Sequence, residues 1–305
     1  MRVTQTLLSD RALAALREGL SRMAKTQNQL GTGRRINTPS DDPAGHSIAT
    51  RLTARVATLD QYDRQATAAQ GPMTATNDLL GSLGDLAGRA QELAVAGATG
   101  GLGAGERAGI ATEVNQMLEE VVAVANGSEQ GRYLLGGQET RTAPLSVTRN
   151  VNGDITAATW NPRGVDGTIN ATISDGVNVQ TNIGGTAVLG ADTDPTFLPA
   201  LLVQLRDALN TNNQAAVNAV IDQFNAATTR LGAAQAQVGG QLQAIDRATS
   251  ANDTARTAAK AALSAVADAD VAKIAVDLSQ QEAVYQAALH AASQAIQPSL
   301  LEFLK

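Results

Sequence analysis

Few side chains in this sequence could carry out acid–base or metal chemistry. The two histidines, His46 and His290, lie far apart, and neither is followed after three or four residues by a second metal ligand. Asp41 and Asp42 form a carboxylate pair that could serve acid–base catalysis or bind a metal. They directly precede Pro43, however, where aspartate accepts hydrogen bonds from the first amides of a helix. We therefore interpret both aspartates as helix caps and predict no catalytic or metal-binding residue.

Gly31 and Gly33, followed by Arg34 and Arg35, are a second candidate, because such a run could cradle a phosphate. No Gly-Lys-Ser/Thr follows and no predicted strand precedes, so the nucleotide-binding pattern is incomplete. The sequence also lacks a serine elbow, an HExxH motif and a dinucleotide fingerprint. With no cysteine, disulfides, thiolate metal sites and cysteine nucleophiles are excluded. We predict no cofactor and no enzymatic activity.

Composition indicates closely packed helices. The 305 residues include only 2% aromatics, and small residues are abundant, which suits closely packed helix bundles. A net charge of −6 argues against a general nucleic-acid partner. The N-terminus lacks the apolar core of a secretory signal, and no run approaches the roughly 18 apolar residues of a membrane span.

Residues typical of a helix C-terminus, followed by residues typical of a helix N-terminus, separate the first two predicted helices. Gly31 and Gly33 admit positive φ and can close the first helix as C-cap residues. Pro39 keeps its predecessor out of helical angles. Asp42 can cap the next helix, and Pro43 then takes its first position, where a missing N–H costs nothing. The residues that we assign to this turn and cap are Gly31, Gly33, Asn37, Pro39, Asp41, Asp42 and Pro43.

Both ends of the sequence read as amphipathic helical arms. The first 35 residues carry seven basic and two acidic side chains, whereas residues 266–305 carry two basic and five acidic ones. Opposite net charges favour pairing of the arms, and their apolar stripes would supply the burial. A basic amphipathic arm could alternatively lie on a membrane surface. The predicted assembly residues are Val3, Leu7, Leu13, Leu16, Leu20, Met23, Leu30, Val271, Ile274, Leu278, Tyr285, Leu289 and Ile296.

Between the arms, helical spacing is interrupted at Gly71-Pro72 and gives way to alternation typical of strands between about 144 and 188. Asn152-Gly153 and Asp175-Gly176 are typical of hairpin turns. Trp160 is predicted to lie in the core of this insertion; an exposed carbohydrate contact is the alternative. We expect a mainly α fold, in which the terminal regions form a long antiparallel helical bundle or coiled coil with a small β-rich insertion. The predicted segments are arm and turn 1–42, bundle 43–140, insertion 141–197, bundle 198–265 and arm 266–305.

Three segments resemble those of bacterial flagellar axial proteins, a family that includes flagellin and the hook-associated proteins of the hook–filament junction. LGTGRRINTPSDDPAG at residues 30–45 resembles the family's loop after the first helix, although Gly31 stands where the family more often has Ser. GRYLLGG at residues 131–137, with Leu135 in place of Phe, is similar to a segment of the junction proteins. SLLEFLK at residues 299–305 resembles the ending of those proteins.

The resemblance implies a structural subunit that joins the hook to the filament by packing of helical arms between subunits. Its expected partners are further copies of the chain in a ring, other hook-associated proteins, flagellin and an export chaperone. It would be extracellular, exported by the flagellar type III apparatus without a cleaved signal. A filament flagellin is the main alternative, and a membrane-surface or glycan-binding protein is a further one.

Overall fold

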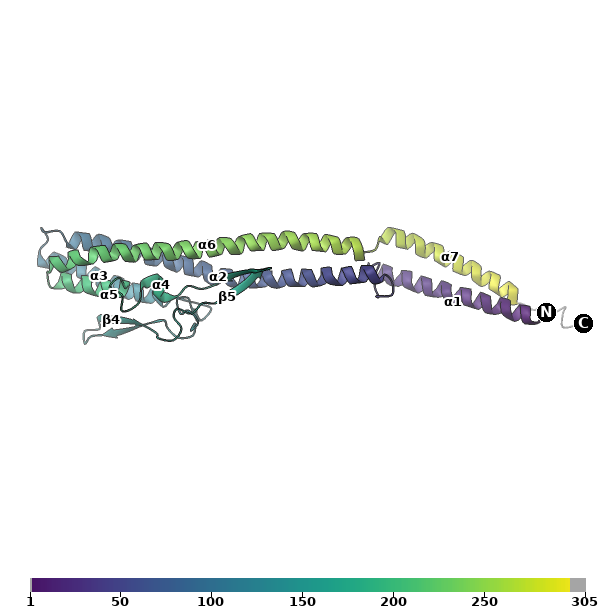
Figure 1. The fold of residues 1–305 in the computed structure, drawn as a ribbon, viewed down its shortest axis with the longest axis horizontal. Coiled ribbons are helices and arrows are strands. Elements are labelled where there is room, and N and C mark those ends of the chain that lie inside the picture. Colours follow the sequence, from purple (N-terminus) through teal and green to yellow (C-terminus); the bar gives the residue numbers. More distant parts are fainter. Residues whose placement is uncertain (1, 297–305) are drawn as a thin grey trace, which may run out of the picture. The chain divides into compact units, whose positions relative to one another are not determined.

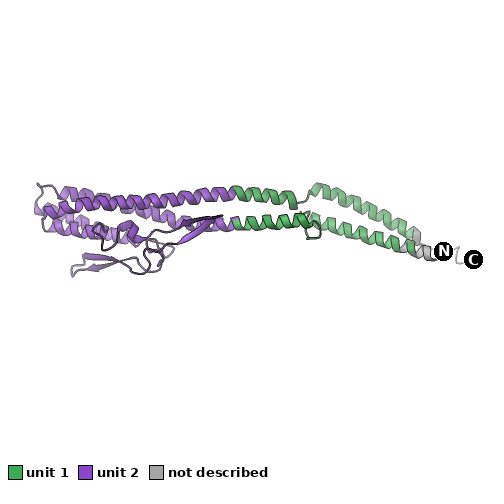
Figure 2. Cartoon of the chain, viewed as in Figure 1, with its two compact units in different colours: residues 1–58, 254–305 green, residues 59–253 purple. Residues whose placement is uncertain are grey.

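The computed structural model describes residues 2–296, with the side chains at the outer ends of the terminal helices left out. The chain divides into two compact units, shown in Figure 2. Unit 1 contains residues 1–58 and 254–305, and unit 2 contains residues 59–253. Long helices dominate both units and strands are confined to unit 2, so the predicted mainly α fold with a small β-rich insertion is confirmed.

Unit 1 consists of four helical segments. In Figure 1, α1 lies beside α7. The helix bounds are α1 Arg2–Thr32, α2 Pro43–Gly97, α6 Gln214–Ala267 and α7 Val271–Ile296. The two arms predicted from the sequence therefore pair with each other in the structure.

The predicted break at Gly71-Pro72 is wrong, because α2 continues through Pro72. An internal proline removes one helical hydrogen bond and crowds the preceding turn. Packing on both sides holds the helix together nonetheless, since Ala69 and Met73 are both buried in hydrophobic clusters. Thr76 also donates a hydrogen bond of 2.7 Å from Oγ1 to the carbonyl oxygen of Pro72. Tertiary burial thus overrides the local helix-breaking preference.

The main core lies in unit 2, where α2 and α6 pack with the shorter helices α3 (Ala104–Ala125) and α5 (Leu198–Asn210). Their contact surfaces present apolar side chains at helical spacing, such as Val114, Leu118 and Val121 of α3. The largest buried side chains include Leu83 and Phe224. This core rests on leucine, valine and alanine, as the scarcity of aromatic residues requires.

A buried arginine completes the end of α2. Arg107 is only 4% exposed. Its Nε and Nη2 donate 2.9 Å hydrogen bonds to the carbonyl oxygens of Gly97 and Thr99, and Nη1 donates to Asn212 Oδ1. Carbonyls at a helix C-terminus lack helical donors and carry the negative end of the helix dipole, so a cation is well placed there.

Three antiparallel two-stranded sheets form the insertion and the segment that precedes it. Leu145 pairs with Trp160, and Asn170 pairs with Gln180. Gly153 and Gly176 adopt positive φ values of 90° and 69° in the two predicted hairpin turns. A short helix, α4 (Gly185–Leu189), follows the last strand. The strands are β1 Ser128–Glu129, β2 Arg132–Tyr133, β3 Leu145–Arg149, β4 Ile155–Trp160, β5 Asn170–Ser174 and β6 Val177–Gln180.

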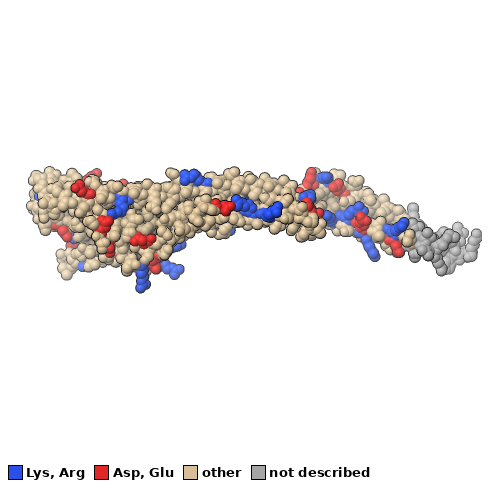
Figure 3. Space-filling model, in the orientation of Figure 1, with Lys and Arg blue, Asp and Glu red and all other residues tan. Residues whose placement is uncertain are grey.

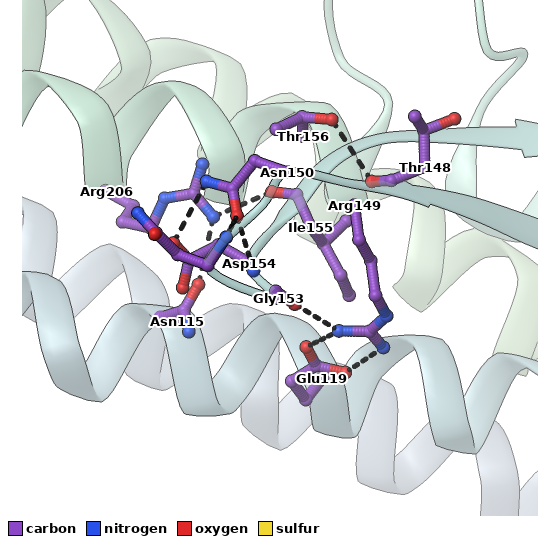
Figure 4. Close-up of polar contacts among 11 residues, drawn as sticks. Asn115, Glu119, Thr148, Arg149, Asn150, Gly153, Asp154, Ile155, Thr156 and Arg206 are labelled. Carbon is purple, nitrogen blue, oxygen red and sulfur yellow. Dashed lines mark hydrogen bonds and ion pairs between the residues drawn. The ribbon is translucent and has the colours of Figure 1, made fainter.

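Two arginines hold the β3–β4 hairpin against the helices of unit 2 (Figure 4). Arg149 makes a two-pronged ion pair with Glu119 of α3, with Nη2 donating to Oε2 at 2.7 Å. This guanidinium lowers the pKa of Glu119. Arg206 of α5 donates from Nη1 to the carbonyl oxygen of Ile155 at 2.7 Å and to Asn115 Oδ1 at 2.9 Å. Both pairs connect segments that are distant in the sequence.

Trp160 is a core residue, as predicted. Its ring is 7% exposed and packs 6.0 Å from the ring of Phe197, measured between centroids. The indole Nε1 donates a 2.7 Å hydrogen bond to the carbonyl oxygen of Gly190. A sugar platform needs an exposed aromatic face, so the buried Trp160 gives no support to the glycan-binding alternative.

Candidate assembly interface

The end of α1 differs from the sequence prediction, because one glycine rather than two leaves the helical conformation. Only Gly33 adopts the left-handed conformation, with φ of 67°, whereas Gly31 lies within the last turn of α1. The helix continues to Thr32, whose Oγ1 donates a hydrogen bond to the carbonyl oxygen of Asn28 at 2.8 Å. The prediction that Gly31 also closes the helix with positive φ is therefore wrong.

The two aspartates of the turn bind different groups. Asp41 Oδ2 accepts hydrogen bonds from the N–H groups of Asn37 and Thr38 at 3.0 and 2.9 Å, and its Oδ1 lies 2.9 Å from Lys25 Nζ. The Lys25 ammonium, together with these N–H groups, holds the pKa of Asp41 well below its usual range. Asp41 therefore organises the turn and ties it back to α1.

Asp42 caps α2. Its Oδ1 accepts a 2.9 Å hydrogen bond from the N–H of Gly45, and its Oδ2 lies 3.2 Å from Arg35 Nη2. The Gly45 bond and then the Arg35 guanidinium lower the pKa of Asp42. Pro43 is the first residue of α2, where its missing N–H leaves no bond unmade.

The remaining predicted turn residues have simpler environments. Asn37 donates from Nδ2 to the carbonyl oxygen of Arg34 at 3.1 Å, across the turn. Pro39 is exposed at the tip of the loop. Among the described residues, neither side chain forms a hydrogen bond to α1 or α7.

The α1–α2 turn is bonded to the connection between α6 and α7. Arg35 donates its backbone N–H to the carbonyl oxygen of Ala267 at 2.8 Å, and Ala269 donates to that of Gly33 at 3.0 Å. Arg35 Nη2 also donates to the carbonyl oxygen of Val266 at 2.8 Å. Both breaks in the helices of unit 1 are thereby fixed to one another.

Beyond this joint, α1 and α7 pair closely. Gly19 of α1 faces Tyr285 of α7, and a Cβ at Gly19 would lie 3.3 Å from the ring. Thr26 Oγ1 donates to Gln281 Oε1 at 3.1 Å, and Ile274 is buried. The described residues contain no ion pair between α1 and α7, so apolar packing, not salt bridges, is the main short-range attraction.

Three comparisons with known proteins bear on this architecture. Residues 3–140 match the bacterial flagellin N-terminal helical region. The flagellar hook-associated protein 3 of Escherichia coli strain K12 is 29% identical over 147 residues. That match covers 48% of this chain and 46% of the Escherichia coli protein, so the chain spans about half the length of that relative. The N-terminal part of the chain is therefore similar to the helical region of bacterial flagellins.

Two further proteins extend the similarity. A flagellin of Listeria innocua is 24% identical over 306 residues, covering 99% of this chain and 98% of that protein. The crystal structure of flagellar hook-associated protein 3 from Legionella pneumophila aligns with a TM-score of 0.61 at 14% identity. It covers 71% of this chain and 98% of that structure, which shows a shared fold.

Many of the predicted assembly residues are exposed on the described part of the chain. Leu13 remains 43% exposed and Leu20 45%. Leu7, Val271 and Leu289 are also exposed, whereas Leu16, Met23, Leu30, Leu278 and Tyr285 are half-buried and Ile274 is buried. The side chains of Val3 and Ile296 lie outside the described residues. Pairing of α1 with α7 therefore covers only part of the predicted stripes.

Two exposed residues of α7 were missed by the sequence prediction. Val276 and Val284 are 66% and 62% exposed, the highest values among the large apolar side chains of the described arms. The sequence prediction assumed a single apolar face on α7 and did not include these two residues. Apolar residues on more than one face of α7 would have indicated a helix with more than one partner.

Figure 3 shows acidic and basic side chains interspersed over the displayed surface, with large uncharged areas between them. Within the described residues, no helix has an apolar stretch long enough to cross a bilayer.

Proposed function

We propose that this chain is a structural subunit of the bacterial flagellum that joins the hook to the filament through packing of its helical arms against neighbouring subunits. The observation that carries the proposal is the large apolar surface left exposed when α1 pairs with α7. It includes Leu7, Leu13, Leu20, Val271, Val276, Val284 and Leu289. In this proposal the arms comprise residues 1–42 and 266–305, and the residues between 43 and 265 form the bundle and its insertion.

The physical argument is that two helices cannot bury all the apolar surface they carry. Covering the remaining surface of one half-exposed leucine or valine stabilises a complex by about 1 kcal/mol. Several such exposed side chains on two adjacent helices are a candidate surface for protein–protein contact. Neighbouring arms would complete the core that α1 and α7 begin.

Similarity to flagellar proteins supports a flagellar role for this surface. The Escherichia coli and Legionella pneumophila relatives are named flagellar hook-associated protein 3, which favours the junction. The proposed partners are other copies of this chain arranged in a ring, other hook-associated proteins and flagellin. A chaperone would cover the α7 stripe before export through the flagellar type III apparatus, after which the subunit is extracellular.

A filament flagellin is the second candidate, because the Listeria innocua flagellin aligns over nearly the whole chain. The two functions differ in where the protein lies. A junction subunit is confined to the base of each filament, whereas a filament subunit is distributed along its length. Immunogold labelling of isolated flagella distinguishes these patterns directly.

Complementation of a deletion strain tests the role of the arms. Cells without the gene should form hooks without filaments and shed flagellin into the medium, and the wild-type gene should restore filaments. Leu13→Gln and Val284→Gln should prevent this restoration, because each places an amide in a surface that assembly must bury.

The matched control is Val151→Gln, which changes a fully exposed valine at the tip of the β3–β4 hairpin in unit 2. This variant should restore filaments. The proposal is wrong if Leu13→Gln and Val284→Gln cells, with normal amounts of exported protein, attach filaments as well as wild-type cells do.

A further inference from the structure

Unit 2 contains a cleft of about 360 Å³ at the proline inside α2. Ala68, Gly71 and Pro72 of α2 form one wall, and the opposite wall includes Glu129 of β1 and Tyr133 of β2. Its volume is at the lower end of the range for small-ligand pockets in proteins. The cleft lies outside the arms and plays no part in the proposed assembly contacts.

The first notable group in this cleft is a backbone carbonyl. In an α-helix the carbonyl oxygen of Ala68 would accept a hydrogen bond from the N–H of residue 72. Pro72 has no N–H, so this carbonyl lacks its helical donor. Ala68 and Pro72 both line the cleft, which places the acceptor at its wall.

The second group is the Glu129 carboxylate. Glu129 is half-buried, and its Oε2 is enclosed without a hydrogen-bond partner among the described residues. The Glu129 carboxylate lies next to Gly71, since a Cβ on Gly71 would be 3.8 Å from Glu129 Oε1. Rotation about the terminal torsion can present either oxygen to the cleft, because that torsion is broad in glutamate. A carboxylate and an unpaired carbonyl therefore adjoin the same space.

Two of the neighbouring polar side chains, Arg132 and Asn182, have hydrogen-bond partners of their own. Arg132 pairs with Glu129 in the backbone register, yet its Nε donates to Thr140 Oγ1 at 3.4 Å. Asn182 accepts the N–H of Ile169 at 2.8 Å and donates from Nδ2 to two backbone carbonyls. Arg132 itself lines the cleft, but the described residues show no bond from its guanidinium to Glu129.

We propose that this cleft binds an alkylammonium or guanidinium group, with the charge against Glu129 and an N–H donated to the Ala68 carbonyl. Charge-assisted hydrogen bonds of this type are stronger than those between neutral groups. The group could belong to a lysine or arginine side chain of another protein or to a free amine. Both sources present the same chemistry to the cleft.

Titration calorimetry on the full chain tests the site with n-butylammonium and ethylguanidinium chloride as probes. Saturable binding is expected, and tetramethylammonium, which has no N–H, should not bind. Glu129→Gln should weaken binding by at least about tenfold, because a charged acceptor becomes neutral. Glu120→Gln, at an exposed carboxylate of α3, is the matched control and should leave binding unchanged.

Pro72→Ala provides the second variant. It supplies an N–H to the Ala68 carbonyl and favours the helix, so the fold should remain intact by thermal unfolding while binding weakens several-fold. A capped tripeptide Gly-Lys-Gly identifies the source: tighter binding than butylammonium indicates a protein side chain, and equal binding indicates a free amine. The proposal is overturned if neither probe saturates, or if Glu129→Gln and Pro72→Ala both bind as the wild type does.

Discussion

Replacing Gly45 by alanine should loosen the turn that joins the arms to the rest of unit 1. Gly45 is buried in the first turn of α2. A Cβ there would collide with Asp42 Oδ2 and lie 2.6 Å from Ile36 Cδ1. The methyl group must therefore displace the carboxylate that caps α2, and Ile36, a buried side chain of the turn, as well.

The expected change in the stability of the turn is the sum of one stabilising and two destabilising effects. Alanine in place of glycine favours a helix by up to about 1 kcal/mol. Losing the Asp42 cap costs about 0.5–2 kcal/mol, and forcing a methyl group against Ile36 costs roughly 1–3 kcal/mol. The penalties outweigh the gain, so Gly45→Ala should destabilise the turn by roughly 1–3 kcal/mol.

Hydrogen exchange followed by mass spectrometry measures this change in the full-length chain. Peptides that contain residues 33–45 and 266–269 should exchange about five- to 150-fold faster in the variant, provided that exchange occurs through local opening. Peptides from α3 and α5 should be unaffected, because both helices belong to unit 2.

The same substitution at Gly31 is the control. Gly31 is helical, and a Cβ there would meet no atom within 4 Å. Gly31→Ala should therefore slow exchange at the end of α1. Exchange in the Gly45→Ala turn that is as slow as in wild type, or slower, would refute the steric argument.

Three further predictions concern charge and burial. Arg107→Met should lower the free energy of unfolding of unit 2 by about 3 kcal/mol in urea denaturation, because carbonyls at the end of α2 lose charged donors; a loss below about 1 kcal/mol would contradict this role. Asp41 and Asp42 have lowered pKa values in the folded chain, so their contribution is complete above about pH 4 and is lost as pH falls through the folded values. Amide exchange of the turn, expressed relative to the intrinsic exchange rate at the same pH, should accelerate in acid. The acceleration should be smaller in an Asp41→Asn, Asp42→Asn double variant, and equal acceleration would exclude these groups. Trp160→Phe should destabilise unit 2 by roughly 1–2 kcal/mol in thermal unfolding, since the Gly190 carbonyl loses its donor; an unchanged transition would show that this bond contributes little.

Features set by short stretches of sequence could be predicted. Helical spacing located the arms, and Asn152-Gly153 and Asp175-Gly176 located the hairpin turns, because positive φ is a local requirement that glycine meets. Asp42 before Pro43 likewise indicated a helix start. In each case the deciding interactions connect residues a few positions apart.

Features that depend on distant contacts could not be predicted. Pro72 looked like a helix break, but burial of Ala69 and Met73 keeps α2 continuous. The exposure of Val276 depends on which face of α7 contacts α1. The cleft at Glu129 likewise requires β1 to lie beside α2, a pairing that no local pattern encodes.

The most direct test of the central claim is the accessibility of the arms before and after assembly. The sequence contains no cysteine, so Leu13→Cys and Val151→Cys each introduce a single labelling site. In the free subunit both thiols should react readily with a maleimide. In intact flagella, position 13 should become at least about tenfold less reactive because neighbouring subunits cover it, while position 151 keeps its reactivity. Equal labelling of position 13 in the free and assembled protein would contradict the account.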